Sequence, residues 1–137
     1  MICEIISGIW SGNADDIYDK DFYNDNLISI VLNCSTDLPF QDIPELKKVR
    51  IPISVYLEPD KDISLLKKNM ESILDYIHKH KETHNIFIYG YSNHTIPSLL
   101  LSIYLVKYGN IPKTSVIDVI RSKNKDVILD MNLSTFL

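Results

Sequence analysis

The sequence predicts an α/β fold, in which a central, mainly parallel sheet is flanked by helices. Three short runs of β-branched and aromatic residues alternate with longer segments of helical periodicity. Such alternation favours parallel pairing, because each helix returns the chain to the start of the next strand. The length of 137 residues suits one core, so we expect residues 1–137 to form a single compact domain.

Three segments are predicted to be strands. Ile28–Asn33 is a β-branched run of the kind found in buried strands. Lys48–Ile53 is expected to be a second strand, with Pro52 at its end or on an edge because proline cannot donate to the ladder. Asn85–Tyr89 is the third strand and stops at Gly90.

Helices are predicted between and after these strands. From Leu66 to Ile77, apolar residues recur at spacings of three and four, opposite a charged face. Pro97–Tyr108 is apolar nearly all round, so we expect a deeply buried helix, with Gly109 at its C-terminal stop. Two shorter helices are predicted, over Asp15–Tyr23 and Thr114–Ser122.

The composition is that of an ordinary globular protein. With 45% hydrophobic residues, 23% charged residues and a net charge of -4, it indicates neither disorder nor a nucleic-acid-binding surface. Two cysteines, Cys3 and Cys34, are too few for a disulfide framework and favour a reducing compartment. No stretch resembles a secretory signal or reaches the ~20 apolar residues of a membrane span. We therefore expect a cytoplasmic protein with no membrane contact.

The loop after the third strand is the predicted ligand site. In doubly wound folds, ligands bind beyond the carboxyl ends of the strands. Residues 90–98 follow such a strand and precede the buried helix. A loop in this position can direct backbone N–H groups and a helix N-terminus at one anion. The sequence therefore predicts a phosphate-handling layout.

The order of these segments resembles that of the dual-specificity protein phosphatases. The family's early turn is similar to Ile9–Ala14, its Val-Leu-Asn strand to Ile30–Asn33, and its Ile-Pro strand to Ile51–Ile53. Tyr104–Tyr108 resembles the helix after the family's phosphate loop, and Val119–Lys123 resembles its Val-Arg-Ser segment. The matches cover nearly the whole chain, and their order and spacing together carry the resemblance. It implies a dual-specificity-phosphatase-like domain.

The phosphate loop of that family reads His-Cys, five residues, Arg and Ser/Thr. When this motif is aligned with the sequence, the His position is Tyr89, the nucleophilic Cys is Gly90, the Arg is Ile96 and the Ser/Thr is Pro97. Asn93 stands where the family usually has a glycine. In the family a thiolate attacks phosphorus and the arginine holds the phosphoryl oxygens. Glycine and isoleucine can do neither. The degenerate phosphate loop comprises Gly90, Tyr91, Ser92, Asn93, His94, Thr95, Ile96 and Pro97.

The resemblance also places a general-acid Asp just after the Ile-Pro strand. By direct spacing this position is Val55, and by counting back from the long helix it is Leu57. Neither side chain can donate a proton. Glu58 and Asp60 are interpreted as loop surface and Asp62 as the N-cap of the long helix, although an acid substituting from this segment stays open.

Other candidate groups are few. Neither cysteine is followed by arginine at the family's spacing, so both are expected to be small core or loop residues. His94 is interpreted as a solvent-facing loop residue, with contact to an anion as the alternative. His80 and His84 stand four residues apart, but without a third ligand beside them no metal site is predicted. Tyr89 is expected to pack beneath the loop.

We therefore expect a pseudophosphatase that needs no cofactor and binds a protein partner in signalling, as inactive members of the family do. Loss of the arginine as well as the cysteine predicts weak or absent phosphate binding and partner contacts elsewhere on the surface. One alternative is a structural homodimer through the former active-site face, with an apolar patch of Tyr91, Ile96, Tyr56 and Leu57. Another is weak residual phosphatase activity.

The origin of the chain is a further expectation. Frequent Ile, Asn, Lys, Asp and Tyr fit an AT-rich genome, such as that of many viruses or protozoa. Poxviruses carry members of the phosphatase family that the chain resembles. A viral pseudophosphatase would act in the host cytoplasm.

Overall fold

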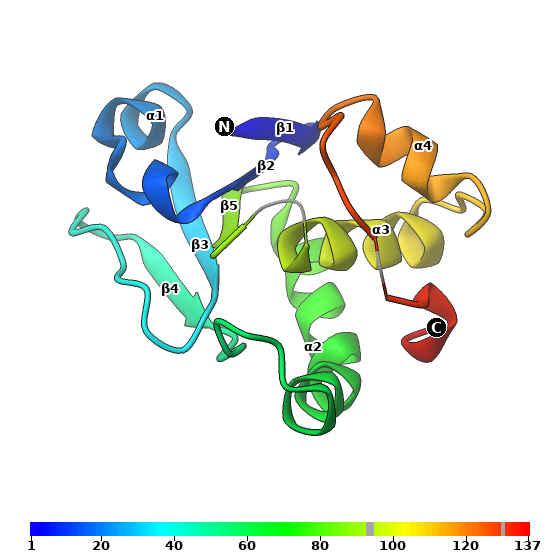
Figure 1. The fold of residues 1–137 in the computed structure, drawn as a ribbon. Coiled ribbons are helices and arrows are strands. Elements are labelled where there is room, and N and C mark those ends of the chain that lie inside the picture. Colours follow the sequence, from blue (N-terminus) through cyan, green and yellow to red (C-terminus); the bar gives the residue numbers. More distant parts are fainter. Residues whose placement is uncertain (93–94, 130) are drawn as a thin grey trace.

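A five-stranded sheet forms the centre of the computed structural model, which describes residues 1–92, 95–129 and 131–137 (Figure 1). The strand order is β1-β2-β5-β3-β4, and neighbours are parallel except for β1 and β2. The strands are β1 (Cys3–Ile6), β2 (Ile9–Gly12), β3 (Ile28–Cys34), β4 (Lys47–Arg50) and β5 (Asn85–Gly90). The predicted α/β class with a mainly parallel sheet is confirmed.

The two central strands confirm the predictions for Ile28–Asn33 and Asn85–Tyr89, and each is one residue longer at its carboxyl end. Side chains of β5 alternate between two core clusters: Ile86 and Ile88 belong to one, and Phe87 belongs to the other. Because both faces are covered, the strand appears in the sequence as a continuous apolar run.

The prediction of a strand over Lys48–Ile53 is wrong at its carboxyl end, because β4 stops at Arg50. The amide of Ile51 still donates to β3, but Pro52 has no N–H and cannot extend the ladder. The amide of Ile53 then turns onto the carbonyl of Ile51, at 2.8 Å. Proline therefore ends the edge strand.

The N-terminal hairpin of β1 and β2 is not among the predicted elements. Its two strands of four residues are joined at Ser7 and Gly8, and Gly8 has a φ of 82° that favours glycine. The family resemblance assigns a turn to Ile9–Ala14, which is wrong for its first four residues. They form a strand because they pair with β1 on one side and β5 on the other.

Helices cover both faces of the sheet (Figure 1). One face carries α2 (Ser64–His80), α3 (Ile96–Tyr108) and α4 (Val116–Arg121). The other carries a 3₁₀ helix (Ala14–Tyr18) and α1 (Lys20–Asp25). A π-helical turn (Pro59–Ile63) precedes α2, and a 3₁₀ turn (Leu133–Thr135) lies near the C-terminus.

Most of the predicted helices are present. The stripe from Leu66 to Ile77 faces the core from α2, and Pro97 lies in the first turn of α3. The predicted helix at Thr114–Ser122 is two residues shorter at its start and one at its end. The predicted helix at Asp15–Tyr23 is split, because Asp19 accepts the Phe22 amide at 3.1 Å and starts a new helix. Among the described residues, no helix is long and apolar enough to cross a membrane.

Gly12 ends β2 where a side chain would collide with the core. A β carbon there would lie 2.7 Å from Cε1 and Cζ of Phe87, a fully buried ring. We predict that Gly12→Ala lowers the free energy of unfolding by about 1–3 kcal/mol through overpacking. Gly90→Ala is the matched control, because its closest contact would be 3.3 Å, to the Cys34 carbonyl oxygen. Urea unfolding measures both variants, and equal losses would contradict the prediction.

Candidate functional site

The loop between β5 and α3 lies at the carboxyl ends of the parallel strands, where the ligand site is predicted. Gly90 is the last residue of β5, and Ile96 is the first residue of α3. Of the residues between them, Asn93 and His94 lie outside the described part of the chain. The expectations for these two residues therefore stay predictions.

A cavity of about 240 Å³ lies beside this loop, and we call it the phosphate-loop cavity. Its walls come from the end of β3, the segment after β4, the loop itself and Met131. Its lining includes Gly90, Tyr91, Ser92, Thr95, Ile96, Val55 and Leu57. The structure thus brings the described residues of the predicted loop, except Pro97, together with both predicted general-acid positions.

Packing leaves limited room for a side chain at position 90. A β carbon would lie 3.3 Å from the Cys34 carbonyl oxygen, a tight contact that requires a small shift, and 3.6 Å from Cδ of Pro97, an ordinary one. The backbone of Gly90 is also not in the left-handed region, in contrast to Gly8. A side chain where the family has its nucleophile therefore requires the backbone beside it to move by a few tenths of an ångström.

Cys34 ends β3 directly beside Gly90, its partner in the strand register. It contributes to the wall of the phosphate-loop cavity but is only 1% exposed. Burial raises the pKa of its thiol to about 12, so the thiol is protonated at neutral pH. A protonated, buried thiol is a poor nucleophile. Cys3 is also buried and free, so both cysteines confirm the expected packing role.

The start of α3 presents apolar groups to the phosphate-loop cavity. Ile96 lines this cavity, as expected for an apolar surface in place of a charged pocket, but it is only 6% exposed and belongs to the main core cluster. The hydroxyl and the amide of Thr95 both turn towards the Ser92 carbonyl, at 3.2 and 3.5 Å. Pro97 has no N–H, so the described part of this helix start offers an anion few donors.

Tyr91 fastens the loop to the segment after β3. Its hydroxyl donates to the carboxylate of Asp37 and lies 3.3 Å from the hydroxyl of Thr36. The side chain is half-buried and bridges two loops. The contribution of Tyr91 to this face is therefore a polar tether as well as an aromatic ring.

A buried hydrogen-bond network centred on Asn33 holds the segment that follows β3. The Asn33 amide nitrogen donates to the Leu38 carbonyl (2.8 Å) and the Tyr89 hydroxyl (3.1 Å), and its oxygen accepts from the Ser35 hydroxyl (2.5 Å). The Tyr89 hydroxyl donates to the carbonyl of Pro39 at 2.6 Å. Tyr89 thus packs beneath the loop as expected, and burial raises the pKa of its phenol, which stays neutral.

Arg50 holds the same segment from the edge of the sheet. Its guanidinium donates to the carbonyls of Ser35 (3.0 Å) and Leu38 (2.9 Å) and lies 4.9 Å from the centre of the Phe40 ring. Arg50 does not line the phosphate-loop cavity. This arginine therefore positions a loop and is not a substitute for the family's phosphate-binding arginine.

The segment after β4 presents three consecutive apolar side chains at the mouth of the phosphate-loop cavity. Val55 is 57% exposed, Tyr56 is 85% exposed and Leu57 is 39% exposed. Glu58 and Asp60 are exposed, which confirms their interpretation as loop surface. At the general-acid position this face is therefore apolar.

The prediction that Asp62 caps the long helix is wrong. Asp62 lies in the π-helical turn, and α2 begins two residues later without a side-chain cap. Its carboxylate is fully buried and accepts hydrogen bonds from the amide (3.2 Å) and hydroxyl (3.2 Å) of Ser54 and from the amide of Glu58 (2.7 Å). Asp62 thus closes the segment from 54 to 58 into a fixed loop.

Among the described residues that line the phosphate-loop cavity, none has a cationic side chain. Lys61 reaches the lining residue Ser54, where its Nζ donates to the hydroxyl at 3.4 Å. Lys61 is exposed. An exposed lysine binds an anion less tightly than an arginine that makes two parallel hydrogen bonds in an enclosed loop.

The two histidines considered for a metal lie before the start of β5, at the opposite end of the strand from the loop. The ring centres of His80 and His84 are 5.5 Å apart, and Nδ1 of His84 lies 2.8 Å from the hydroxyl of Ser29. Within the described ranges, no three His, Cys, Asp or Glu side chains are grouped as metal ligands.

Three residues that shape the site were not identified as such from the sequence. Asn33 had one signal, a polar amide at the end of a buried β-branched run. Asp62 and Arg50 had none, because their partners are backbone groups that only the folded loops bring within reach. The sequence therefore located the loop but not its supports.

No family model and no curated protein sequence matches this chain. Solved structures do match. A mouse putative dual specificity phosphatase complexed with zinc tungstate has a TM-score of 0.84 at 13% identity, over 98% of this chain and 83% of that chain. Human DUSP28 has a TM-score of 0.83 at 13% identity, over 98% and 89%. A human tyrosine phosphatase-like serine/threonine/tyrosine-interacting protein has a TM-score of 0.78 at 7% identity, over 98% and 90%.

We predict that Asn33→Ala lowers the free energy of unfolding by about 2–4 kcal/mol, because it leaves buried partners on Leu38, Ser35 and Tyr89 incompletely bonded. Asn69→Ala is the matched control, since its exposed side chain donates to the Leu65 carbonyl within α2. That change should stay within about 0.5 kcal/mol. Urea unfolding of both variants is the measurement, and equal stability would contradict the role given to Asn33.

Proposed function

Because the chain has the α/β fold of the dual-specificity phosphatases, we propose that it is a catalytically inactive relative of these enzymes that binds a protein partner. The observation that carries this proposal is the character of the phosphate-loop cavity. Gly90 and Ile96 stand where the resemblance requires a nucleophile and a cation, and Val55 and Leu57 stand at the general-acid position.

The proposed loss of catalysis begins with the nucleophile. A phosphoenzyme intermediate requires a side chain that attacks phosphorus, and Gly90 has none. Cys34 is the neighbouring thiol, but it is buried and protonated.

The proposed loss extends to charge and proton transfer. Ile96 offers no hydrogen bond to phosphoryl oxygens, and exposed Lys61 is already bonded to Ser54. The buried carboxylate near the general-acid position, Asp62, is engaged by three donors and holds its own loop. Each loss costs transition-state stabilisation, and together they favour an inactive protein.

The exposed apolar side chains at the mouth of the phosphate-loop cavity support a binding role. Val55, Tyr56 and Leu57 are consecutive and exposed. Grouped apolar side chains with an aromatic anchor are typical of protein-binding surfaces. We define Val55, Tyr56 and Leu57 as the mouth patch, and Tyr56 and Leu57 belong to the apolar patch expected from the sequence.

The partner proposed is a signalling protein, and the proposed setting is the cytoplasm, or the host cytoplasm if the chain is viral. One solved structure of this fold belongs to a protein whose name describes it as phosphatase-like and interacting. The fold is thus compatible with a role in binding.

We predict no turnover of p-nitrophenyl phosphate above the buffer rate, with an active dual-specificity phosphatase as the positive control. The Gly90→Cys, Ile96→Arg double variant should recover little activity, because Val55, Leu57 and Pro97 remain unsuited to the reaction.

Phosphotyrosine and phosphothreonine peptides should bind to the unmodified protein with a Kd above about 1 mM, measured by isothermal titration calorimetry. Parental turnover, or tight phosphopeptide binding lost in Lys61→Ala, would overturn this proposal.

Self-association is the second candidate function, because the mouth patch is also suited to a homodimer. We predict instead a constant mass near the 15.8 kDa of one chain in multi-angle light scattering across protein concentrations. The exposed side chain of Tyr56 supports a test by Tyr56→Asp, which should leave the mass unchanged. A mass that rises with concentration and falls back in Tyr56→Asp would favour the homodimer.

A further inference from the structure

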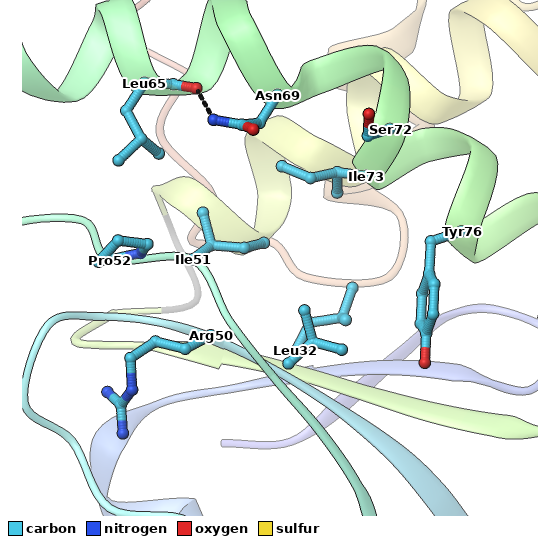
Figure 2. A pocket seen from close by; sticks show the side chains of 10 residues that line it. Leu32, Arg50, Ile51, Pro52, Leu65, Asn69, Ser72, Ile73 and Tyr76 are labelled. Carbon is cyan, nitrogen blue, oxygen red and sulfur yellow. Dashed lines mark hydrogen bonds between the residues drawn. The ribbon is translucent and has the colours of Figure 1, made fainter.

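A second cavity, of about 380 Å³, lies between α2 and the edge strand β4 (Figure 2). Figure 2 shows side chains of α2 pointing towards the strand, with the Arg50 guanidinium directed away from the space between them. We call this hollow the β4–α2 groove. Its apolar lining comes from Leu32, Val49, Ile51, Leu65, Ile73 and Tyr76. It shares no lining residue with the phosphate-loop cavity.

One side of the groove is an open sheet edge. The amide of Ile51 donates to β3, so by alternation the backbone groups of Lys48 and Arg50 point to the outer side of β4. The sheet order ends at β4, and no described segment pairs with that side. An outward row of N–H and C=O groups can pair with an added strand.

Cationic side chains lie on both faces of this sheet edge. Lys47 and Lys48 are exposed on β4, and by alternation the Lys47 side chain lies on the groove face while that of Lys48 lies on the opposite face with Arg50. On α2, Lys68 follows Leu65 by three residues and Lys79 follows Tyr76 by three, so both are neighbours of residues that line the groove. None of these four lysines forms an ion pair within the described parts of the chain.

The acidic side chains of α2 lie towards a different neighbour. Asp75 accepts a hydrogen bond from Tyr108 of α3 at 2.7 Å. This bond is the main reason that the pKa of Tyr108 is raised, and the Glu71 carboxylate adds to it. Asp75 is thus engaged by α3, although it also lines a surface hollow with Lys79 and with the groove residues Ser72 and Tyr76.

We propose that the β4–α2 groove binds an extended segment of a partner protein in which acidic and aliphatic residues alternate, and that this segment adds to β4 as a sixth strand. Alternate side chains of an added strand point to one face, where the aliphatic ones reach the groove. The acidic side chains between them point to the opposite face of the sheet, where the side chains of Lys48 and Arg50 lie. The inference goes beyond the proposed function and names a surface separate from the phosphate-loop cavity.

The test uses two fluorescein-labelled heptapeptides, one alternating glutamate with valine and the other alternating lysine with valine. Fluorescence anisotropy should show the acidic peptide binding roughly tenfold or more tightly than the basic one, and binding should weaken in about 1 M NaCl. Hydrogen exchange should show protection of the Lys48 and Arg50 amides by the acidic peptide. Equal affinity for both peptides, or no binding, would overturn the proposal.

Two pairs of variants locate the site. Ser72→Trp places a large ring over the groove and should weaken binding roughly tenfold, whereas Lys67→Trp, on the far face of α2, should not. Lys48→Pro removes the outward N–H, and Lys48→Ala removes the charge alone, so the proline variant should bind more weakly. Circular dichroism confirms that each variant is folded. Equal binding by Ser72→Trp and Lys67→Trp would overturn the proposal.

Other occupants give different results. A second copy in the groove would make the parent protein dimeric in light scattering and Ser72→Trp monomeric, which would overturn the proposal. Peptide binding lost in Tyr56→Asp but retained in Ser72→Trp would assign the peptide to the mouth patch instead. Phosphatase assays on the same variants keep this inference separate from the proposed function, because neither Ser72 nor Lys48 lines the phosphate-loop cavity.

Discussion

The buried amide of Asn33 is the interaction on which the geometry of the site depends. It lies where β3 and β5 end side by side, and it bonds at once to β5, through Tyr89, and to the segment after β3. That segment in turn receives Tyr91 from the loop above and Arg50 from the edge strand. Satisfied networks of this kind fix one arrangement, because any shift would leave polar groups unpaired in the core. The Asn33 network therefore fixes one side of the phosphate-loop cavity.

The parts of the fold that the sequence predicted are those whose burial leaves a local pattern. β3 and β5 are buried on both faces, so each appears in the sequence as a continuous apolar run. α2 is buried on one face, so its apolar residues recur with the helical period. The hairpin of β1 and β2 has strands of four residues, too short for a period, and Ser7-Gly8 was its main signal. β4 is shorter than predicted at its carboxyl end, because Pro52 has no N–H to donate to the neighbouring strand. A single side chain, Asp19, divided the helix predicted near the N-terminus.

The site was predictable to a similar depth. The position of the loop follows from strand order. The family resemblance indicated that Gly90 and Ile96 occupy the positions of the nucleophile and the arginine. What the sequence did not predict were contacts between segments: Asp62 bonds eight residues back to Ser54, and Ile96 packs into the main core cluster as well as lining the cavity. Such contacts depend on loop closure, which local propensity does not encode. The fold is shared with the phosphatases, and a fold alone does not determine the chemistry of a site.

The lysines of β4 have a consequence for the behaviour of this protein in concentrated solution. An open sheet edge can pair with the same edge of another copy and seed polymers. Such pairing would bring Lys47 and Lys48 of two copies close together, and like charges on paired strands repel. The edge can then remain uncovered without becoming a template for its own aggregation. Solubility and selectivity would thus both depend on the positive charge of this edge strand.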